Sequence, residues 1–207
     1  MSPVDVDYIG EGRSDDAIAR RLIEAAGGRA ATAYRGARKG SGKQDLDRRL
    51  RGLNAGVASG GRLTLVLRDL DQDAVCPLAL LANLLPDRQP RLLLRIAVRT
   101  AESWLVADAQ AYAKYCGLQV GHLPSSPESV FQLKNRMIQS ADSDRAPKLA
   151  RHLADTRQRG VADWAAMGEW HSNFAEGPWN PERAAHSNRS PSLGRALARL
   201  RACIREG

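Results

Sequence analysis

The sequence lacks the features of membrane and secreted proteins. Its 207 residues contain no run of about 18 apolar residues, the length that spans a bilayer. The opening residues, MSPVDVDYIGEG, show no basic segment followed by an apolar stretch, so we expect a cytoplasmic protein with no secretory signal and no membrane partner. The three cysteines, Cys76, Cys116 and Cys203, are odd in number and widely spaced without a CxxC pair, which argues against a disulfide framework and a zinc site.

The composition is that of a globular protein with an excess of positive charge. Hydrophobic residues make up 43% and charged residues 26% of the chain, and its length suits one domain with at most a modest extension. The net charge is +8, which favours a polyanionic partner such as nucleic acid. Basic residues gather in the stretches 29–51 and 183–207, so the acidic residues are concentrated elsewhere.

Alternating apolar patterns predict an α/β fold. Short apolar or alternating runs predict strands, and runs with helical spacing between them predict helices, the first of them capped by Ser14. The predicted strands are 4–9, 30–34, 63–67 and 92–98, and the predicted helices are 14–26, 44–52, 77–85 and 101–115. Such alternation is typical of a Rossmann-like parallel sheet with helices on both faces.

The remainder of the chain is predicted to be mostly helical. A break rich in turn-forming residues, GHLPSSP, separates it from the alternating part. Helix candidates follow at 127–140, 146–157 and 192–205. We therefore expect a core over residues 1–120 and a mostly helical extension over 121–207 that packs on the core.

Acidic residues follow three of the four predicted strands. Glu11 and Asp15 follow the first, Asp69 and Asp71 the third, and Glu102 the fourth. Because the carboxyl ends of parallel strands share one edge of the sheet, we expect these side chains to converge there. Converging carboxylates repel one another unless a cation is bound, and oxygen ligands suit Mg²⁺ or Mn²⁺. The D-x-D spacing is expected to place Asp69 and Asp71 on one side of a strand.

A simpler interpretation stays open for each of these residues. Acidic side chains at strand ends and helix starts are ordinary solvated turn formers, and Asp15 is well placed to interact favourably with a helix dipole.

The order of these motifs resembles a known family. A strand, Glu11-Gly12, a helix and a later strand ending in Asp69-x-Asp71 are similar to the Toprim domain of topoisomerases, primases and nucleases of the OLD (overcoming lysogenisation defect) family. The spacing Glu11-x-x-x-Asp15 and the segment Thr100-Ala101-Glu102 match further OLD-type elements, and Lys148 is the candidate for a downstream lysine. The segments RIAVRTAESWLVAD and SPSLGRAL also resemble uncharacterised bacterial Toprim-like proteins found beside ATPases in defence loci.

The resemblance implies a nuclease that cleaves nucleic acid phosphodiesters with two Mg²⁺ or Mn²⁺ ions. Glu11, Asp69 and Asp71 would be the primary ligands, and Asp15 and Glu102 would complete a second metal position. Lys148 would neutralise charge that develops on the phosphate, although the residue could equally be a solvated helix residue. The same resemblance implies an effector of antiphage defence that is controlled by an ATPase or sensor protein.

A glycine-rich basic segment resembles a phosphate-binding loop only superficially. RKGSGKQ has Ala37 where a Walker A motif needs glycine, and Gln44 where it needs Ser or Thr, which argues against nucleotide binding. We instead expect a basic loop that grips DNA or RNA, with a plain solvated loop as the alternative. The candidate contacts are Arg35, Arg38, Lys39 and Lys43.

Two other functions remain open from the sequence. One is a non-catalytic Toprim-like module that binds nucleic acid or a partner protein, and the other is a Mg²⁺-dependent phosphotransfer enzyme that acts on small substrates. A homo-oligomer is also possible.

The histidines lack metal-binding spacing and are predicted to lie at the surface: His122, His152, His171 and His186.

Overall fold

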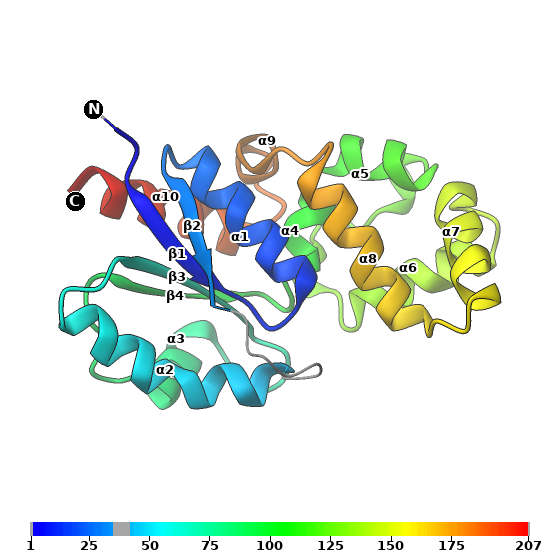
Figure 1. Ribbon diagram of the computed structural model, residues 1–207. Helices are drawn as coiled ribbons and strands as arrows, with labels where there is room; N and C mark the ends of the chain where they lie inside the picture. Colours follow the sequence, from blue (N-terminus) through cyan, green and yellow to red (C-terminus); the bar gives the residue numbers. More distant parts are fainter. Residues whose placement is uncertain (1, 35–41, 207) are drawn as a thin grey trace.

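The structure is a computed structural model that describes residues 2–34 and 42–206. Its central feature is a parallel four-stranded sheet with the order β2-β1-β3-β4. The α/β prediction, with a parallel sheet flanked by helices and a helical C-terminal part, is confirmed (Figure 1). In order, the sheet elements and their helices are β1 (Asp5–Ile9), α1 (Arg13–Ala25), β2 (Arg29–Ala33), α2 (Gly42–Ala58), β3 (Leu63–Asp69), α3 (Pro77–Leu84) and β4 (Leu92–Ala97).

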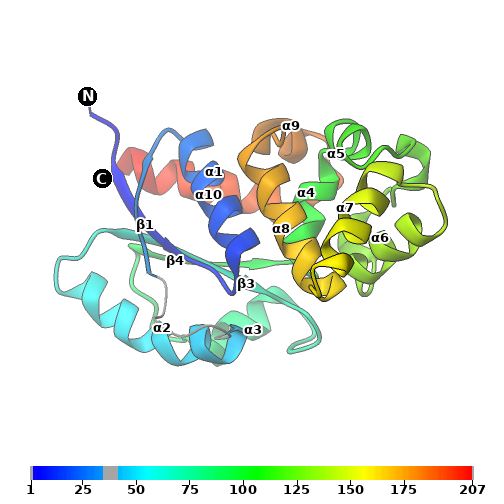
Figure 2. The ribbon, with the colours of Figure 1, turned by 45° about the vertical axis from the view of Figure 1, so that its right-hand side comes forward.

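The order in which strands are added to the sheet reverses between β1 and β3. After β1, helix α1 leads outward to the edge strand β2, and α2 then returns the chain to β3 on the other side of β1. Helices α2 and α3 cover one face of the sheet, whereas α1 and α10 (Pro191–Glu206) cover the other (Figures 1 and 2). Ligands of open parallel sheets bind beyond the carboxyl ends of strands at such a switch point.

Strand β3 is buried on both faces, as its continuous apolar sequence predicts. Leu63, Leu65 and Leu67 belong to the hydrophobic core under α1, and Val66 belongs to the smaller core under α2 and α3. Alternate side chains of a strand point to opposite faces, so a strand between two helical layers has to be apolar at almost every position. The polar residues at its carboxyl end therefore mark where β3 leaves the core.

The chain after the sheet forms a helical layer that continues the larger core. Helix α8 packs on α1, α9 packs on α4, and α10 packs on β4. One hydrophobic cluster joins Val6 of β1 to Phe174 of α8 and Leu200 of α10. The remaining elements are α4 (Glu102–Ala107), α5 (Ala109–Cys116), the 3-10 turns η1 (Val120–His122) and η2 (Pro127–Ser129), α6 (Leu133–Asp142), α7 (Pro147–Gln158), α8 (Asp163–Glu176) and α9 (Pro181–His186).

Two local predictions were wrong. Gly12, not Ser14, is the N-cap of α1. The helix expected over 101–115 is divided at Asp108, whose buried carboxylate accepts hydrogen bonds from the Asn180 backbone and, at 2.6 Å, from the Arg183 side chain. Helices α8 and α9 were not predicted.

No helix in the described part of the chain is both long and apolar enough to cross a membrane.

Candidate metal centre

Four carboxylates from three strand ends come together at the switch point. Glu11 lies just after β1 and Asp15 in the first turn of α1, while Asp69 ends β3 and Glu102 begins α4 after β4. We call these four residues the carboxylate cluster. Their negative charges are close enough to perturb one another: Asp15, Glu102 and Glu11 all act on Asp69, and Glu102 and Glu11 act on Asp15. The predicted convergence of these four residues is therefore observed.

Backbone amides orient three of the four carboxylates. Asp69 Oδ1 accepts a hydrogen bond from Ala101 N at 2.8 Å, which connects the end of β3 to the segment after β4. Asp15 Oδ2 accepts from Gly12 N at 2.8 Å, and Glu11 Oε1 accepts from the backbone N of Asp69 at 2.9 Å. These bonds stabilise the charged forms and limit the freedom of the side chains before any ligand arrives.

The close approach of Asp15 requires a glycine at position 10. A Cβ atom on Gly10 would lie 2.3 Å from the Cβ atom of Asp15, far inside van der Waals contact, and 3.2 Å from its backbone carbon. At Gly12 the nearest atom to an added Cβ is Asp15 Oδ2 at 3.7 Å, which is an ordinary contact. Gly10 thus lets the first turn of α1 pack directly on the end of β1.

Burial and mutual repulsion penalise ionisation in the cluster. Burial, followed by the charges of neighbouring carboxylates, raises the pKa of Asp69 and of Asp15 well above the ordinary value. Burial also raises the pKa of Glu11, although the Asp69 backbone and Arg68 oppose the change. A group of buried acids is stabilised when it binds protons or a cation, so the cluster favours the binding of positive charge.

Lys134 brings a positive charge into contact with the cluster. Its Nζ atom lies 2.7 Å from Oε1 of Glu102, whose side chain is only 8% exposed. Although burial opposes it, Lys134 lowers the pKa of Glu102 to about 2, so this carboxylate stays ionised. Lys134 lies on α6, in the helical part of the chain. Sequence reasoning missed it because no local motif distinguishes it from other helical lysines.

A buried histidine lies behind Glu102. His171, on α8, is fully buried, and its Nδ1 atom lies 3.9 Å from Glu102 Oε1. Its Nε2 atom is 2.8 Å from the Tyr112 hydroxyl. Burial lowers the pKa of His171 to about 4, so the ring is neutral at physiological pH. The prediction that this histidine lies at the surface was wrong.

Arg68 connects the cluster to the α2 side of the sheet. Its side chain is 3% exposed and contacts three carboxylates, Glu11 at 3.2 Å, Asp47 at 2.9 Å and Asp73 at 2.6 Å. Burial alone would lower the pKa of the guanidinium, but these carboxylates outweigh it and the pKa is raised. The contact of Arg68 with α2 could have been predicted from the alternation of β3, which places this side chain on the face that α2 covers.

Asp71 lies apart from the arrangement that the D-x-D spacing predicted. Strand β3 ends at Asp69, and Asp71 adopts a left-handed backbone conformation with a φ of 46°. Its carboxylate pairs with Lys43 Nζ at 3.0 Å, and the same nitrogen contacts Asp73 at 2.9 Å. Asp71 still exerts repulsion on Glu11, so it lies at the margin of the cluster. The expectation that Asp69 and Asp71 share one side of a strand was wrong, because the strand has already ended.

Lys148 lies at another surface. Its Nζ atom donates a hydrogen bond to the Lys114 carbonyl at 3.0 Å. With Tyr115, Arg151 and Trp170, both lysines line a separate pocket of about 580 Å³ among α5, α7 and α8. Among the described residues, Lys148 forms no ion pair with the carboxylate cluster, whereas Lys134 does.

The structure describes one of the four residues predicted to form the basic nucleic-acid-binding loop. Arg35, Arg38 and Lys39 lie outside the described residues. Lys43 lies in the first turn of α2 and forms ion pairs with Asp71 and Asp73, so it neutralises acidic residues next to the cluster.

The side chains as placed do not form a ready metal shell. Within residues 2–34 and 42–206, no three His, Cys, Asp or Glu side chains are arranged closely enough to hold a metal ion. The donor chemistry of the cluster nevertheless suits a hard cation, since its ligands are carboxylate oxygens whose repulsion a divalent ion would relieve.

Comparison with known proteins gives no family for this chain. It matches no protein-family model, no curated protein and no solved structure.

Proposed function

We propose that this protein is a metal-dependent nuclease that cleaves phosphodiester bonds of DNA or RNA. The observation that carries the proposal is the convergence of Glu11, Asp15, Asp69 and Glu102 at the switch point of a parallel sheet, beside Lys134. Buried acids that raise one another's pKa are costly to keep for structure alone. Together with the excess of basic residues elsewhere, they favour a site where cations and phosphates meet.

The four carboxylates of the cluster are the residues that would hold Mg²⁺ or Mn²⁺, with two ions as the proposed number. The chemistry supplied by such ions is charge stabilisation of a phosphoryl group during its transfer. Asp71 is now paired with Lys43, so it would become a ligand only if this ion pair broke and its carboxylate bound the metal ion instead.

Backbone amides and one lysine of the protein prepare the site. The backbone amides of Ala101 and Gly12 orient Asp69 and Asp15. Lys134 keeps Glu102 ionised, and its charge would neutralise negative charge that develops on a phosphate, so we assign to it the role that the resemblance suggested for Lys148.

A second candidate function is a non-catalytic module that binds nucleic acid or a partner protein. It is favoured by the existing pairing of the acidic residues: Glu11 and Asp73 contact Arg68, and Asp71 contacts Lys43. In that case the acids would form a salt-bridge network that joins the sheet to α2 without binding metal.

We further propose control by an ATPase or sensor partner in antiphage defence. This rests on the resemblance to Toprim-like proteins and on the harm that an uncontrolled nuclease does to its host.

The test combines binding and cleavage. The melting temperature of the wild-type protein is measured with and without Mg²⁺ or Mn²⁺, beside the Asp69→Asn variant. Plasmid DNA and RNA are then incubated with each protein, alone and with the product of the neighbouring gene. The proposal expects metal to raise the wild-type melting temperature only, and cleavage that the variant lacks. No metal effect and no cleavage in any combination would favour the non-catalytic module.

A further inference from the structure

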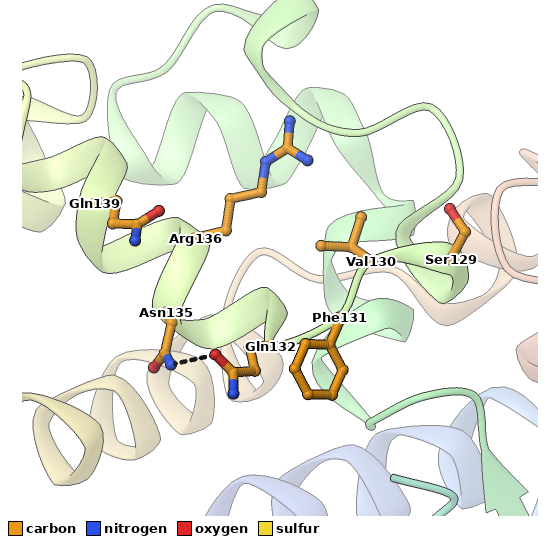
Figure 3. A pocket seen from close by; sticks show the side chains of 7 residues that line it. All are labelled: Ser129, Val130, Phe131, Gln132, Asn135, Arg136 and Gln139. Atoms are coloured by element: carbon orange, nitrogen blue, oxygen red, sulfur yellow. Dashed lines mark hydrogen bonds between the residues drawn. The ribbon is translucent and has the colours of Figure 1, made fainter. Parts of the chain in front are cut away.

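A shallow pocket of about 710 Å³ lies along the first turns of α6, the helix that carries Lys134 (Figure 3). Leu133 and Met137 anchor this helix in the core. The opposite side presents a stripe at the i, i+3, i+4 and i+7 positions of a helix. That stripe consists of Gln132, Asn135, Arg136 and Gln139, all of them exposed.

Phe131 supplies an aromatic surface at this pocket. The side chain is 58% exposed, so a large apolar ring remains in water although burial would favour folding. The next residue, Gln132, has a left-handed backbone with a φ of 51°, which is uncommon for a residue other than glycine. Phe131 points away from α6 on the same side as the Gln132 and Asn135 amides (Figure 3). An exposed ring beside a polar helix face is suited to stacking on a planar ligand.

The two amides beside the ring offer one donor and one acceptor. Asn135 Nδ2 donates a hydrogen bond to Gln132 Oε1 at 3.0 Å (Figure 3). This leaves the Gln132 amino group and the Asn135 carbonyl oxygen for a ligand. If both amides were turned over, the pair would still leave one donor and one acceptor. Adjacent donor and acceptor groups are also what the edge of a nucleobase presents.

The charge of the pocket favours an anionic ligand. None of the described residues that line it is acidic. Arg136 is exposed and makes no ion pair with any residue that the structure describes. In contrast, the cations nearest the carboxylate cluster, Lys134 and Arg68, are already paired with carboxylates. Arg136 is therefore available to a phosphate group.

We propose that this pocket, formed by Phe131, Gln132, Asn135 and Arg136, binds an unpaired nucleotide of the substrate strand. The base stacks on Phe131, its edge contacts the two amides, and Arg136 binds a backbone phosphate. The proposal rests on the proposed nuclease function, because Lys134, which contacts Glu102 of the carboxylate cluster, lies on the same turn of α6 as Asn135 and Arg136. Bases inside a duplex are stacked on each other and cannot reach the ring, so the substrate is single-stranded DNA or RNA.

Binding is tested without cleavage. Fluorescence anisotropy in EDTA measures the affinity of the full chain for a labelled single strand of about 12 nucleotides, as DNA and as RNA, and for the matching duplex. Phe131→Ala should weaken single-strand binding by about 5- to 100-fold, the range found for loss of one base–aromatic stack. Phe131→Tyr should retain the affinity. The control is Trp164→Ala, which removes another exposed aromatic residue, on α8, and should leave binding unchanged.

The outcomes separate this inference from the proposed function. If Phe131→Ala binds single strands as wild type does, or if it and Trp164→Ala lose affinity equally, the nucleotide pocket is wrong. If single strands bind in a Phe131-dependent way but no metal supports cleavage, the nuclease proposal fails and the nucleotide pocket stands.

Discussion

Lys134 Nζ lies 2.7 Å from Glu102 Oε1 and joins the helical C-terminal part of the chain to the acidic edge of the sheet. The pair is mostly buried on the glutamate side and partly exposed on the lysine side. Through this contact a residue of α6 supplies positive charge to the carboxylate cluster.

Replacing this lysine should destabilise the protein. Lys134→Met leaves Glu102 facing Asp15 and Asp69 without a cation, and we expect unfolding free energy to fall by about 1–3 kcal/mol, between the values for exposed and buried ion pairs. The matched control is Lys148→Met, which removes a lysine that forms no ion pair with any described residue and whose Nζ donates to a backbone carbonyl, so stability should change by at most about 0.5–1 kcal/mol. Urea denaturation measures both. Equal effects would show that Lys134 has no special role at the cluster.

Removing one charge of the cluster should have the opposite effect. Asp69→Asn keeps the acceptor for Ala101 N but relieves repulsion with Asp15, Glu102 and Glu11. Without metal, we expect the variant to melt about 2–4 °C above wild type, which corresponds to about 1 kcal/mol for a chain of this size. Thermal unfolding in EDTA is the measurement. A variant less stable than wild type would mean that the Asp69 charge is stabilising as it stands.

The glycine at the end of β1 should be sensitive to a single added methyl group. Gly10→Ala forces Asp15 away from its position, and we expect a loss of about 1–3 kcal/mol, as for overpacked sites, together with a loss of the metal-induced rise in melting temperature. Gly12→Ala adds the same group where there is room, keeps the N–H that binds Asp15, and should leave the metal response intact. If both variants behave alike, the close packing of Asp15 on Gly10 does not control the site.

Acid should weaken the fold through His171. Burial holds the pKa of this histidine at about 4, below its value of about 6.5 in an unfolded chain. The unfolded state therefore binds the proton more readily, and the unfolding free energy decreases as the pH falls from about 6.5 to about 4. The full shift corresponds to a loss of about 3 kcal/mol.

The histidine contribution is isolated by comparing variants over that pH range. His171→Gln should show a shallower decrease in stability than wild type, measured by urea denaturation at successive pH values. His122→Gln changes an exposed histidine and should follow the wild-type curve. Parallel curves for all three proteins would place the acid sensitivity in other groups.

Local sequence patterns were enough to predict the layered α/β architecture and the acidic edge of its sheet. Continuous apolar runs such as 63–67 can only be buried between two layers, and acidic residues directly after them have to lie where strands leave the core. Both are local properties of the chain. That is why Glu11, Asp15, Asp69 and Glu102 were predicted to converge without any knowledge of how the helices fold.

Which other residues join these four depends on the long-range packing of the fold. Lys134 and His171 come from helices whose paths across the molecule depend on long-range packing. The family resemblance therefore suggested Lys148 instead, and the lack of metal-binding spacing placed His171 at the surface. Asp71 follows the D-x-D pattern, yet β3 ends two residues earlier and Lys43 captures its carboxylate. The positions of strand ends and helix crossings result from the packing of the whole core, and they determine which charges meet.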